Sequence, residues 1–480
     1  MTGSVFTPAD LAVLLAYLAG TTAVGLWLGR RQKDSRDYFV ASHAIPWWAV
    51  LISVVATETS AITFISIPSV AYLGNFSFLQ LALGYIVGRT VVAYTLLPRY
   101  FQGELVTAYA LLERRFGLGA RRFASIVFMI TRGLADSVRV FATAIPISLI
   151  LGTSLRPTLV MPIAILILGA LTVFYTYQGG MRAVIWTDVI QTCVYLIAGI
   201  AAVILIGNWS TIFSQASQLG KLRVFNLSTN LAQPYTLWAG VFGGAFLTMA
   251  SHGADQLIVQ RLLAASSLRD ARRALIGSGF VVFLQFALFL VIGTGLYAIY
   301  HGRVFQRADD VFPTFILQHM PPGLVGLVVA AILAATMSTH SGAINSLAAS
   351  TTHDIYLPIS KKKPDDPSVL KMARVFTLAW GVVLTAGALL YPAQGAPVVV
   401  VALSIASFTY GALLGAFFLA MIWHRAVQRD AIIGMIVGLV TMAIVVFYPP
   451  VARQIAWPWY VLIGTTITLT TGIVSSWSHT

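Results

Sequence analysis

The sequence is poor in the residues from which disulfides, metal centres and hydrolytic sites are built. Its 480 residues include one cysteine, Cys193, which excludes an internal disulfide and a cysteine-based metal centre. The chain has no HExxH, GxSxG or nucleotide-binding pattern, so we disfavour an enzyme that works inside the membrane. Its candidate acids and bases would be Glu58, His252, Asp255 and His340, and we expect the two histidines to be hydrogen-bonded structural groups.

Charge is also scarce, and acidic residues are fewer than basic ones. Charged residues make up 10% of the chain and hydrophobic residues 58%, with a mean hydropathy of +0.84. This composition is typical of a polytopic membrane protein, not of a soluble globule. The net charge of +14 comes from basic residues between apolar runs, as orientation in a membrane requires. We therefore expect no binding to nucleic acid.

Runs of about twenty apolar residues predict thirteen transmembrane helices. They lie near residues 8–29, 45–73, 77–101, 122–152, 157–178, 183–206, 236–262, 273–300, 320–353, 371–392, 398–424, 430–448 and 457–476. We expect the first run to be a retained span, because no basic residues precede it and no cleavage pattern follows it. Most arginines and lysines near span ends fall in the odd-numbered connections. Because positive charge resists translocation, the N-terminus should face outside and the C-terminus inside, and we expect a bacterial inner membrane.

Ionisable residues inside the spans are costly in hydrocarbon and mark cavities or buried pairs. They are Glu58, Arg132, Asp136, Arg139, Asp188 and Asp255, with His252 and His340 as weaker members. Arg132, Asp136 and Arg139 share one helix face, so Asp136 can pair with either arginine. The cluster is either a structural salt bridge between neighbouring spans or, through the arginine that remains, a partner for Glu58 or an anionic substrate.

Polar residues interrupt the second predicted span, in the stretch "SVVATETSAITFISIPS" at residues 53–69. They are Thr57, Glu58, Thr59, Ser60 and Thr63. This composition is poor for a uniform helix and predicts a break near residues 56–61. A broken membrane helix exposes carbonyl oxygens that can hold a cation.

A second polar cluster lies in the ninth predicted span, in "ATMSTHSGAINS". It contributes Ser338, Thr339, Ser341, Asn345 and Ser346. Neutral oxygens suit an alkali cation, and because the cluster has no carboxylate, sodium fits better than calcium. Asp188, inside the sixth predicted span, is either structural, an ion ligand or a relay.

Five segments carry a resemblance to a known family. They are "ATETSAITF", "LPRYF…TAYALLERRFG", "YQGGMRAVIWTDVIQ", "ADQLIVQRLLAA" and "ATMSTHSGAINS…HDIY". Together, in this order over nearly the whole chain, they resemble the sodium:solute symporter family, which includes bacterial carriers of proline, galactose and sialic acid. The resemblance implies a leucine-transporter-type fold in one integral-membrane domain. A leading helix at 8–29 would precede two inverted five-helix repeats, at about 45–206 and 236–425, and two trailing helices at about 430–476.

The resemblance also implies site residues. A shared sodium site would use the carbonyls of Ala56, Thr59 and Ala335 and the hydroxyls of Ser338 and Thr339. A second sodium would use Asp188, Ser341 and a hydroxyl at the next position, which here is Gly342, so one or two sodium ions remain possible. The substrate cavity would include Glu58, Ser60, Thr63, Gln80, His252 and Asp255, with Arg139 or Arg132 as the partner of a carboxylate. Galactose carriers of the family have an amide where Glu58 stands, which argues against a sugar site.

These features predict sodium-coupled import of a small polar or anionic organic solute by alternating access. The coupling ion would be Na⁺, with no other cofactor and no obligatory protein partner beyond the lipid bilayer. Two alternatives remain, a proton-coupled carrier that uses Glu58 or Asp188 and a transporter-like membrane sensor. The polar segment 207–234 either caps an external vestibule or forms an ordinary solvated loop.

Overall fold

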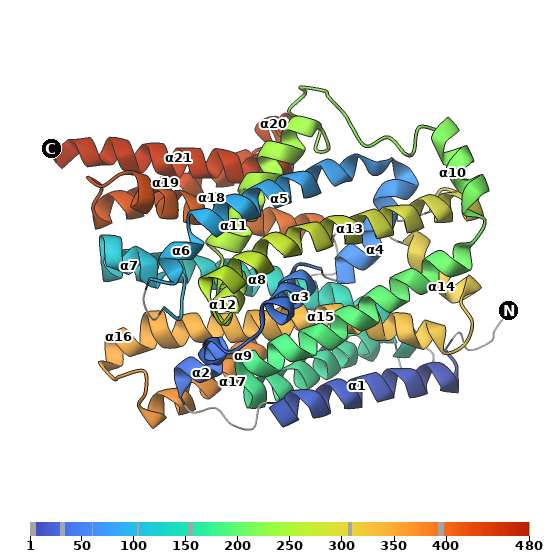
Figure 1. The fold of residues 1–480 in the computed structure, drawn as a ribbon, viewed down its shortest axis with the longest axis horizontal. Helices are drawn as coiled ribbons and strands as arrows, with labels where there is room; N and C mark the ends of the chain where they lie inside the picture. Colours follow the sequence, from blue (N-terminus) through green and yellow to red (C-terminus); the bar gives the residue numbers. More distant parts are fainter. Residues whose placement is uncertain are drawn as a thin grey trace.

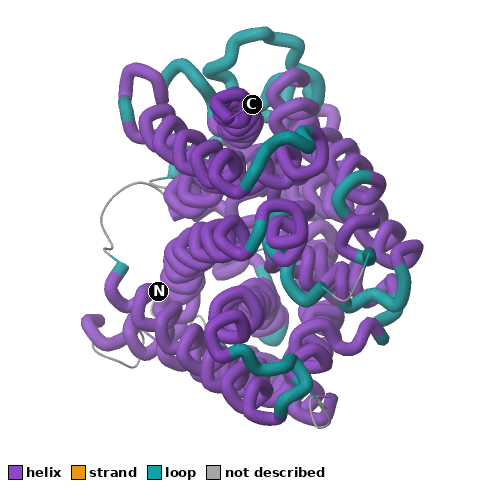
Figure 2. Tube along the Cα trace, turned by 90° about the vertical axis from the view of Figure 1, so that its left-hand side faces the viewer, coloured by secondary structure: helices purple, strands orange, loops and turns teal. Residues whose placement is uncertain are grey.

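A computed structural model describes residues 6–28, 34–59, 61–102, 105–151, 157–305, 310–391 and 398–479. These residues form helices joined by turns and loops, with no β-strand among them. Most of the long helices run side by side across the molecule (Figure 1). Viewed from one end, many of them are seen nearly along their axes (Figure 2). The architecture is the predicted all-α bundle.

The principal helices and their bounds follow the chain from blue to red in Figure 1. They are α1 (Pro8–Leu28), α2 (Ser35–Val40), α3 (Trp47–Glu58), α4 (Ala61–Leu73), α5 (Leu79–Tyr94), α6 (Leu97–Tyr100), α7 (Ala110–Phe116), α8 (Leu118–Leu151), α9 (Pro157–Ile206), α10 (Trp209–Gln218), the π-helix η3 (Ala239–Gly243), α11 (Gly244–Gly253), α12 (Gln256–Leu263), α13 (Leu268–Tyr300), α14 (Val311–His319), α15 (Leu324–Ser350), the π-helix η5 (Thr351–Tyr356), α16 (Leu357–Ser360), α17 (Pro367–Leu390), α18 (Val398–Ile422), α19 (Gln428–Phe447), α20 (Pro449–Ala452) and α21 (Tyr460–Ser476).

Each of the thirteen predicted ranges coincides with helical structure. Eight spans in the described part of the chain are long and apolar enough to cross a membrane, and the bent pair of α3 and α4 makes a ninth. The ranges 157–178 and 183–206 join end to end in α9, where Gly180 has φ 55° and ψ −156°. A Cβ there would lie 2.5 Å from the carbonyl oxygen of Tyr38, so the junction requires glycine. The number of thirteen crossings stays a prediction.

Two helices are broken in mid-course. The pair α3 and α4 bends by 64°, and Thr59 between them is extended, with φ −85° and ψ 100°. This is the break predicted near residues 56–61. The pair α11 and α12 is interrupted at Asp255, which is also extended, with φ −90° and ψ 122°. These breaks lie near the starts of the two predicted repeats, whose boundaries stay predictions.

Close helix contact places α5 against the second broken helix. Gly84 and Gly88 form a small-xxx-small pattern, which lets membrane helices approach closely. A Cβ on Gly84 would lie 2.1 Å from the carbonyl oxygen of Gly240, and one on Gly88 would lie 2.3 Å from that of Ala245. The next residue, Arg89, is thereby carried into the protein interior.

Helix α15 is the buried centre of the bundle. It packs against α9, α8, α1 and α3, and 89% of the residues in its most apolar window are buried. Its polar side chains cannot reach water, because Ser338, Thr339, Ser341, Asn345 and Ser346 are all buried. Such side chains must find partners in the protein or bind something else.

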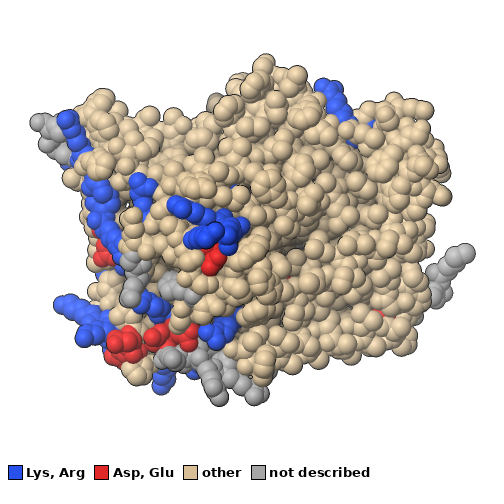
Figure 3. All heavy atoms as spheres, viewed as in Figure 1, with Lys and Arg blue, Asp and Glu red and all other residues tan. Residues whose placement is uncertain are grey.

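Lysine and arginine side chains gather at one end of the molecule, on the left of Figure 3, where α7 and α16 lie. Much of the remaining visible surface is neutral (Figure 3). This uneven distribution is the pattern from which a cytoplasmic end is predicted.

Segment 207–234 packs on the helix ends at the opposite side of the bundle. Lys221 Nζ donates to the carbonyl of Tyr72 at 2.8 Å and lies 3.8 Å from the ring centroid of Tyr297. The backbone N–H of Asn226 donates to Oε1 of Gln80 at 3.1 Å. A cation at the last carbonyls of α4 is favourable. These contacts favour a cap over a freely solvated loop.

Candidate functional site

The predicted sodium ligands come together where α3 breaks beside α15. All five residues are buried: Ala56, Thr59, Ala335, Ser338 and Thr339. The hydroxyl of Thr339 lies 3.1 Å from the carbonyl oxygen of Ala335 and 3.4 Å from that of Thr57. It therefore connects α15 to the last turn of α3, whose carbonyls have no partner within their own helix.

A small cavity lies among these residues. Its volume is about 10 Å³, and its walls include Ala56, Thr59, Ala335 and Ser338 together with side chains from α9 and α13. A site that holds one water molecule needs about 10–15 Å³, so there is room for one small ion. The C-terminal end of α3 carries the negative end of a helix dipole, which favours a cation.

Buried polar atoms without a hydrogen-bond partner in the described part of the chain lie at this cavity. They are both amide atoms of Gln191. Ser338 Oγ lies near Asp188 and the Tyr195 hydroxyl near Gln285, in neither case with the geometry of a good hydrogen bond. The other side of the Gln285 amide accepts a hydrogen bond from Thr59 Oγ1 at 3.0 Å. Since buried polar groups are normally paired, this cluster fits an ion and water. Hydroxyl and carbonyl oxygens are the donors that a hard alkali cation prefers.

The second predicted ion site contains an arginine. The fully buried carboxylate of Asp188 accepts hydrogen bonds from Ser53 and from Nη2 of Arg261, the latter at 3.2 Å. A Cβ on Gly342 would lie 2.4 Å from Arg261 Nη2. The hydroxyl of Ser341 donates to the carbonyl of Ser338 at 3.1 Å. A tethered guanidinium thus fills the space that a side chain at position 342 would need, and its charge compensates that of Asp188.

Glu58 forms an ion pair with Arg89 of α5. Arg89 is completely buried, and its Nη1 donates to Ser278 Oγ at 2.6 Å. His252 Nε2 lies 3.7 Å from Glu58 Oε2, and Nδ1 of that ring lies 2.8 Å from the hydroxyl of Ser251. The sequence analysis offers an arginine of α8 as a partner for Glu58, but Arg89 takes that place.

The charged cluster on α8 separates into two groups. Arg132 forms an ion pair with Asp255 and donates to the hydroxyl of Tyr410 at 3.0 Å. Asp136 instead lies 3.1 Å from Nδ1 of His340. The expectation that Asp136 pairs with one of the arginines is wrong for the described contacts, because Arg132 reaches across to the break between α11 and α12. Arg132 therefore connects α8 to the break between α11 and α12 and to Tyr410 of α18.

Arg139 has no ion pair or hydrogen bond of its side chain in the described part of the chain. It lines a cavity of about 10 Å³ with Asp136, Thr143, Thr336, Thr339 and His340. Thr339 thus contributes both to this cavity and to the predicted sodium ligands. An arginine inside a membrane helix is costly, and a guanidinium whose N–H groups have no partner is suited to an anionic ligand.

The other predicted substrate residues have different surroundings. Gln80 donates to the carbonyls of Ser77 and Tyr235, both at 3.1 Å, so its amide nitrogen is occupied by backbone carbonyls. Asp255 caps α12, because its Oδ1 accepts from the N–H of Leu257 at 2.8 Å. Thr63 is half-buried on α4, and Ser60 lies outside the described residues.

Two arginines, Arg89 and Arg261, were missed by the sequence analysis. Both lie inside predicted spans, at 77–101 and 236–262. The test that selected Glu58 and Asp188, an ionisable residue within an apolar run, would also have selected their partners. What it could not provide is the pairing, which depends on how four helices pack.

Known proteins resemble this chain along nearly its full length. A sequence model of the sodium:solute symporter family matches residues 38–438. The sodium/sialic acid symporter NanT of Aliivibrio fischeri is 30% identical over 98% of this chain and 93% of its own length. The sodium/sialic acid symporter SiaT of Proteus mirabilis is 30% identical over 90% of this chain and 88% of its own.

The fold agrees with these sequence matches. A solved Na⁺-coupled sialic acid symporter, in a substrate-bound outward-open state, superposes with a TM-score of 0.87 at 28% identity and covers 98% of both chains. The predicted fold class, the coupling ion Na⁺ and the assignment as a transporter and not an enzyme are thereby confirmed. The chain belongs to the sodium:solute symporter family, and it is an integral membrane protein that couples the movement of a small solute to that of sodium ions.

Proposed function

We propose that this protein imports a small organic anion together with one sodium ion. The observation that carries this proposal is the guanidinium of Arg139, which lines a cavity beside Thr339 and forms no ion pair or hydrogen bond among the described residues. A carboxylate bound there would accept the hydrogen bonds that this guanidinium leaves unused. The sialic acid carried by the relatives NanT and SiaT is itself an acid, which supports the same class of solute.

Coupling follows from the residue that the two predicted sites share. Thr339 belongs to the predicted sodium ligands and also lines the cavity of Arg139. Sodium bound at α3 and α15 would fix Thr339 and thereby shape the cavity for the solute. By linkage, the solute would raise the affinity for sodium by the same factor.

The proposal of one sodium ion rests on Arg261. Its guanidinium already compensates the charge of Asp188, and the glycine at position 342 leaves room for it. A second cation at Asp188 would be repelled by this fixed positive charge. The remaining predicted ligands, Ala56, Thr59, Ala335, Ser338 and Thr339, form one cation site.

The same ion pairs count against a proton-coupled carrier. Glu58 faces Arg89, and Asp188 faces Arg261. In each pair a buried guanidinium occupies the carboxylate that a transported proton would have to reach. We also propose that the protein lies in a bacterial inner membrane, with its N-terminus outside and its basic end (Figure 3) in the cytoplasm. In this proposal it requires the lipid bilayer and no protein partner.

The test is thermal unfolding of the purified protein with a panel of solutes. The panel contains N-acetylneuraminate, pyruvate and lactate as anions and proline and galactose as solutes without net charge, each in sodium chloride or in choline chloride of equal ionic strength. We expect one anion to raise the melting temperature in sodium and not in choline. Arg139→Gln should lose this shift, while Arg453→Gln, a change at an exposed loop, should retain it.

Uptake then decides the direction and the coupling. The anion that stabilises the protein should enter proteoliposomes under an inward sodium gradient, with a flux ratio of one sodium ion per solute. A shift produced equally by neutral solutes in wild type and Arg139→Gln would contradict the anion proposal. A flux ratio of two would contradict the role given to Arg261.

A further inference from the structure

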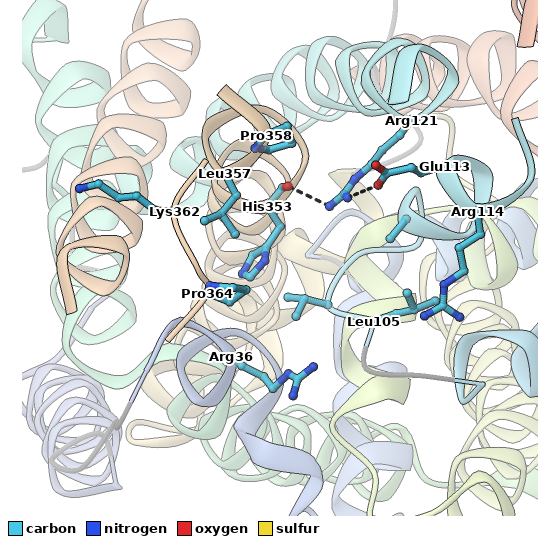
Figure 4. Close-up of a pocket in the computed structure, with 12 residues that line it drawn as sticks. Arg36, Leu105, Glu113, Arg114, Arg121, His353, Leu357, Pro358, Lys362 and Pro364 are labelled. Atoms are coloured by element: carbon cyan, nitrogen blue, oxygen red, sulfur yellow. Dashed lines mark hydrogen bonds and ion pairs between the residues drawn. The ribbon is translucent and has the colours of Figure 1, made fainter. Parts of the chain in front are cut away.

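A larger cavity opens at the basic end of the molecule, away from the sodium and solute residues. Its volume is about 320 Å³, within the range of small-ligand sites, and it is lined by α2, α7, the start of α8, η5, α16 and the loop that follows α16. Figure 4 shows the side chains around it. The polar ones are Arg36, Glu113, Arg114, Arg121, His353 and Lys362.

The charges around this cavity are unbalanced. Arg121 lies 2.7 Å from Asp354 and also pairs with Glu113 (Figure 4), so two carboxylates share one guanidinium. The remaining cations come from separate segments, Arg36 on α2, Arg114 on α7 and Lys362 after α16. Arg114 and Lys362 are exposed, and each has one partner at its terminal nitrogens, a carbonyl and a hydroxyl respectively. Both retain N–H groups for a further ligand.

A buried histidine supplies a second observation. His353 is 5% exposed, and its Nε2 has no hydrogen-bond partner in the described part of the chain. The ring makes a T-shaped contact with Phe39, at 5.6 Å between centroids. In Figure 4 the ring extends from η5 toward the side on which Arg36 lies. A buried ring nitrogen without a partner at the wall of a polar cavity indicates a missing ligand or water.

From these observations we infer a binding site for a phosphate group at this end of the protein. A phosphate presents several strong acceptor oxygens in different directions, which suits donors that arrive from α2, α7, η5 and the loop after α16. The group belongs either to the headgroup of an acidic phospholipid or to a soluble phosphate compound. Basic pockets between helices at the cytoplasmic side are the kind of site that acidic headgroups occupy.

A ligand in this site would tie separate segments together. Arg36 lies on α2, which leads into α3 and the predicted sodium carbonyls, whereas Arg114 and Lys362 belong to segments far away in the sequence. Binding to the folded state alone raises stability by mass action. Stabilisation that depends on these cations is therefore the expected signature, and it does not depend on which solute the protein carries.

The experiment uses the full-length protein in two settings. In detergent, the melting temperature is measured against sodium phosphate, with sodium concentration and ionic strength held constant by sodium chloride. In nanodiscs, phosphatidylcholine alone is compared with a mixture containing phosphatidylglycerol. The proteins are wild type, the double variant Arg114→Gln/Lys362→Gln, and the control Lys371→Gln, an exposed change at the start of α17.

We expect a saturable rise of several degrees for wild type and Lys371→Gln, reduced to a third or less in the double variant. A rise with inorganic phosphate supports a soluble ligand, and a rise only with phosphatidylglycerol supports a lipid headgroup. No rise in either setting would overturn the inference. An equal rise in the double variant would also overturn it, because phosphate stabilises proteins generally through exclusion from their surface.

Discussion

The hydroxyl of Thr339 is the smallest feature on which the proposed coupling depends. We predict that Thr339→Val, which keeps the shape and removes the hydroxyl, loses sodium-specific stabilisation, whereas Thr339→Ser retains it. Sodium at a hundred times its Kd would stabilise the wild type by about 2.7 kcal/mol. The measurement is the difference in melting temperature between sodium chloride and choline chloride, so the effect of the substitution on the sodium-free protein cancels.

A matched control separates ion binding from packing. Thr172 on α9 is fully buried, and its hydroxyl bonds to the carbonyl four residues earlier, at 2.9 Å, as Thr339 does. Thr172→Val should change stability equally in sodium and in choline. If Thr339→Val keeps the full difference between the two salts, the hydroxyl is not a sodium ligand.

At the level of residues, the sequence predicts where ionisable side chains lie better than it predicts which residues they pair with. An ionisable side chain in an apolar run is visible without a structure, and this signal located Glu58, Asp188 and Arg139. Their partners could not be assigned, because Arg89 and Arg261 approach from helices that are distant in the chain. The sequence shows that position 342 carries no hydroxyl. Only the packing shows that the guanidinium of Arg261 occupies the space that a side chain there would need.

At the level of helices, the break between α11 and α12 depends on one carboxylate with two tasks. Asp255 caps α12 through one oxygen and binds Arg132 and Tyr410 through the other. Asparagine is also a good N-cap, so Asp255→Asn preserves the cap and leaves Arg132 buried without its partner. Removing one member of a buried ion pair costs about 3–5 kcal/mol. We predict a large fall in apparent melting temperature.

A double-mutant cycle and a second cap test this explanation. Asp255→Asn combined with Arg132→Gln should lose much less stability than the two single changes added together. Asp366→Asn makes the same change at the N-cap of α17, where Oδ1 accepts from the N–H of Ser368 at 2.8 Å without a buried arginine. It should have little effect. Additive single changes would mean that the ion pair contributes nothing to holding the break.

The helices themselves were well predicted from apolar length, and the break in the first broken helix from its polar residues. Two features were less accessible. The segments on either side of Gly180 are two helices, as predicted, but they meet at a kink with no loop between them, because the positive φ of a glycine allows the chain to turn there. The cap formed by segment 207–234 depends on Lys221 reaching the end of α4, which no local pattern indicates.

At the level of the whole molecule, the proposed stoichiometry determines how membrane potential acts on transport. One sodium ion and one monovalent anion carry no net charge, so the potential should contribute nothing to uptake. Each net charge moved through 100 mV would contribute about 2.3 kcal/mol, or roughly a 50-fold change in accumulation. A tenfold sodium gradient alone supports about tenfold accumulation of the anion.

The measurement is uptake into proteoliposomes at a fixed sodium gradient, with a potassium diffusion potential set to zero or to 100 mV, negative inside. We predict equal final accumulation of a monovalent anion at both potentials. The reason is the positive charge of Arg261, which we propose takes the place of a mobile second cation at Asp188 and stays with the protein throughout the cycle. Accumulation that rises about 50-fold with the potential would show that an additional positive charge crosses, and Arg261 would then be a structural partner of Asp188 beside a working second ion site.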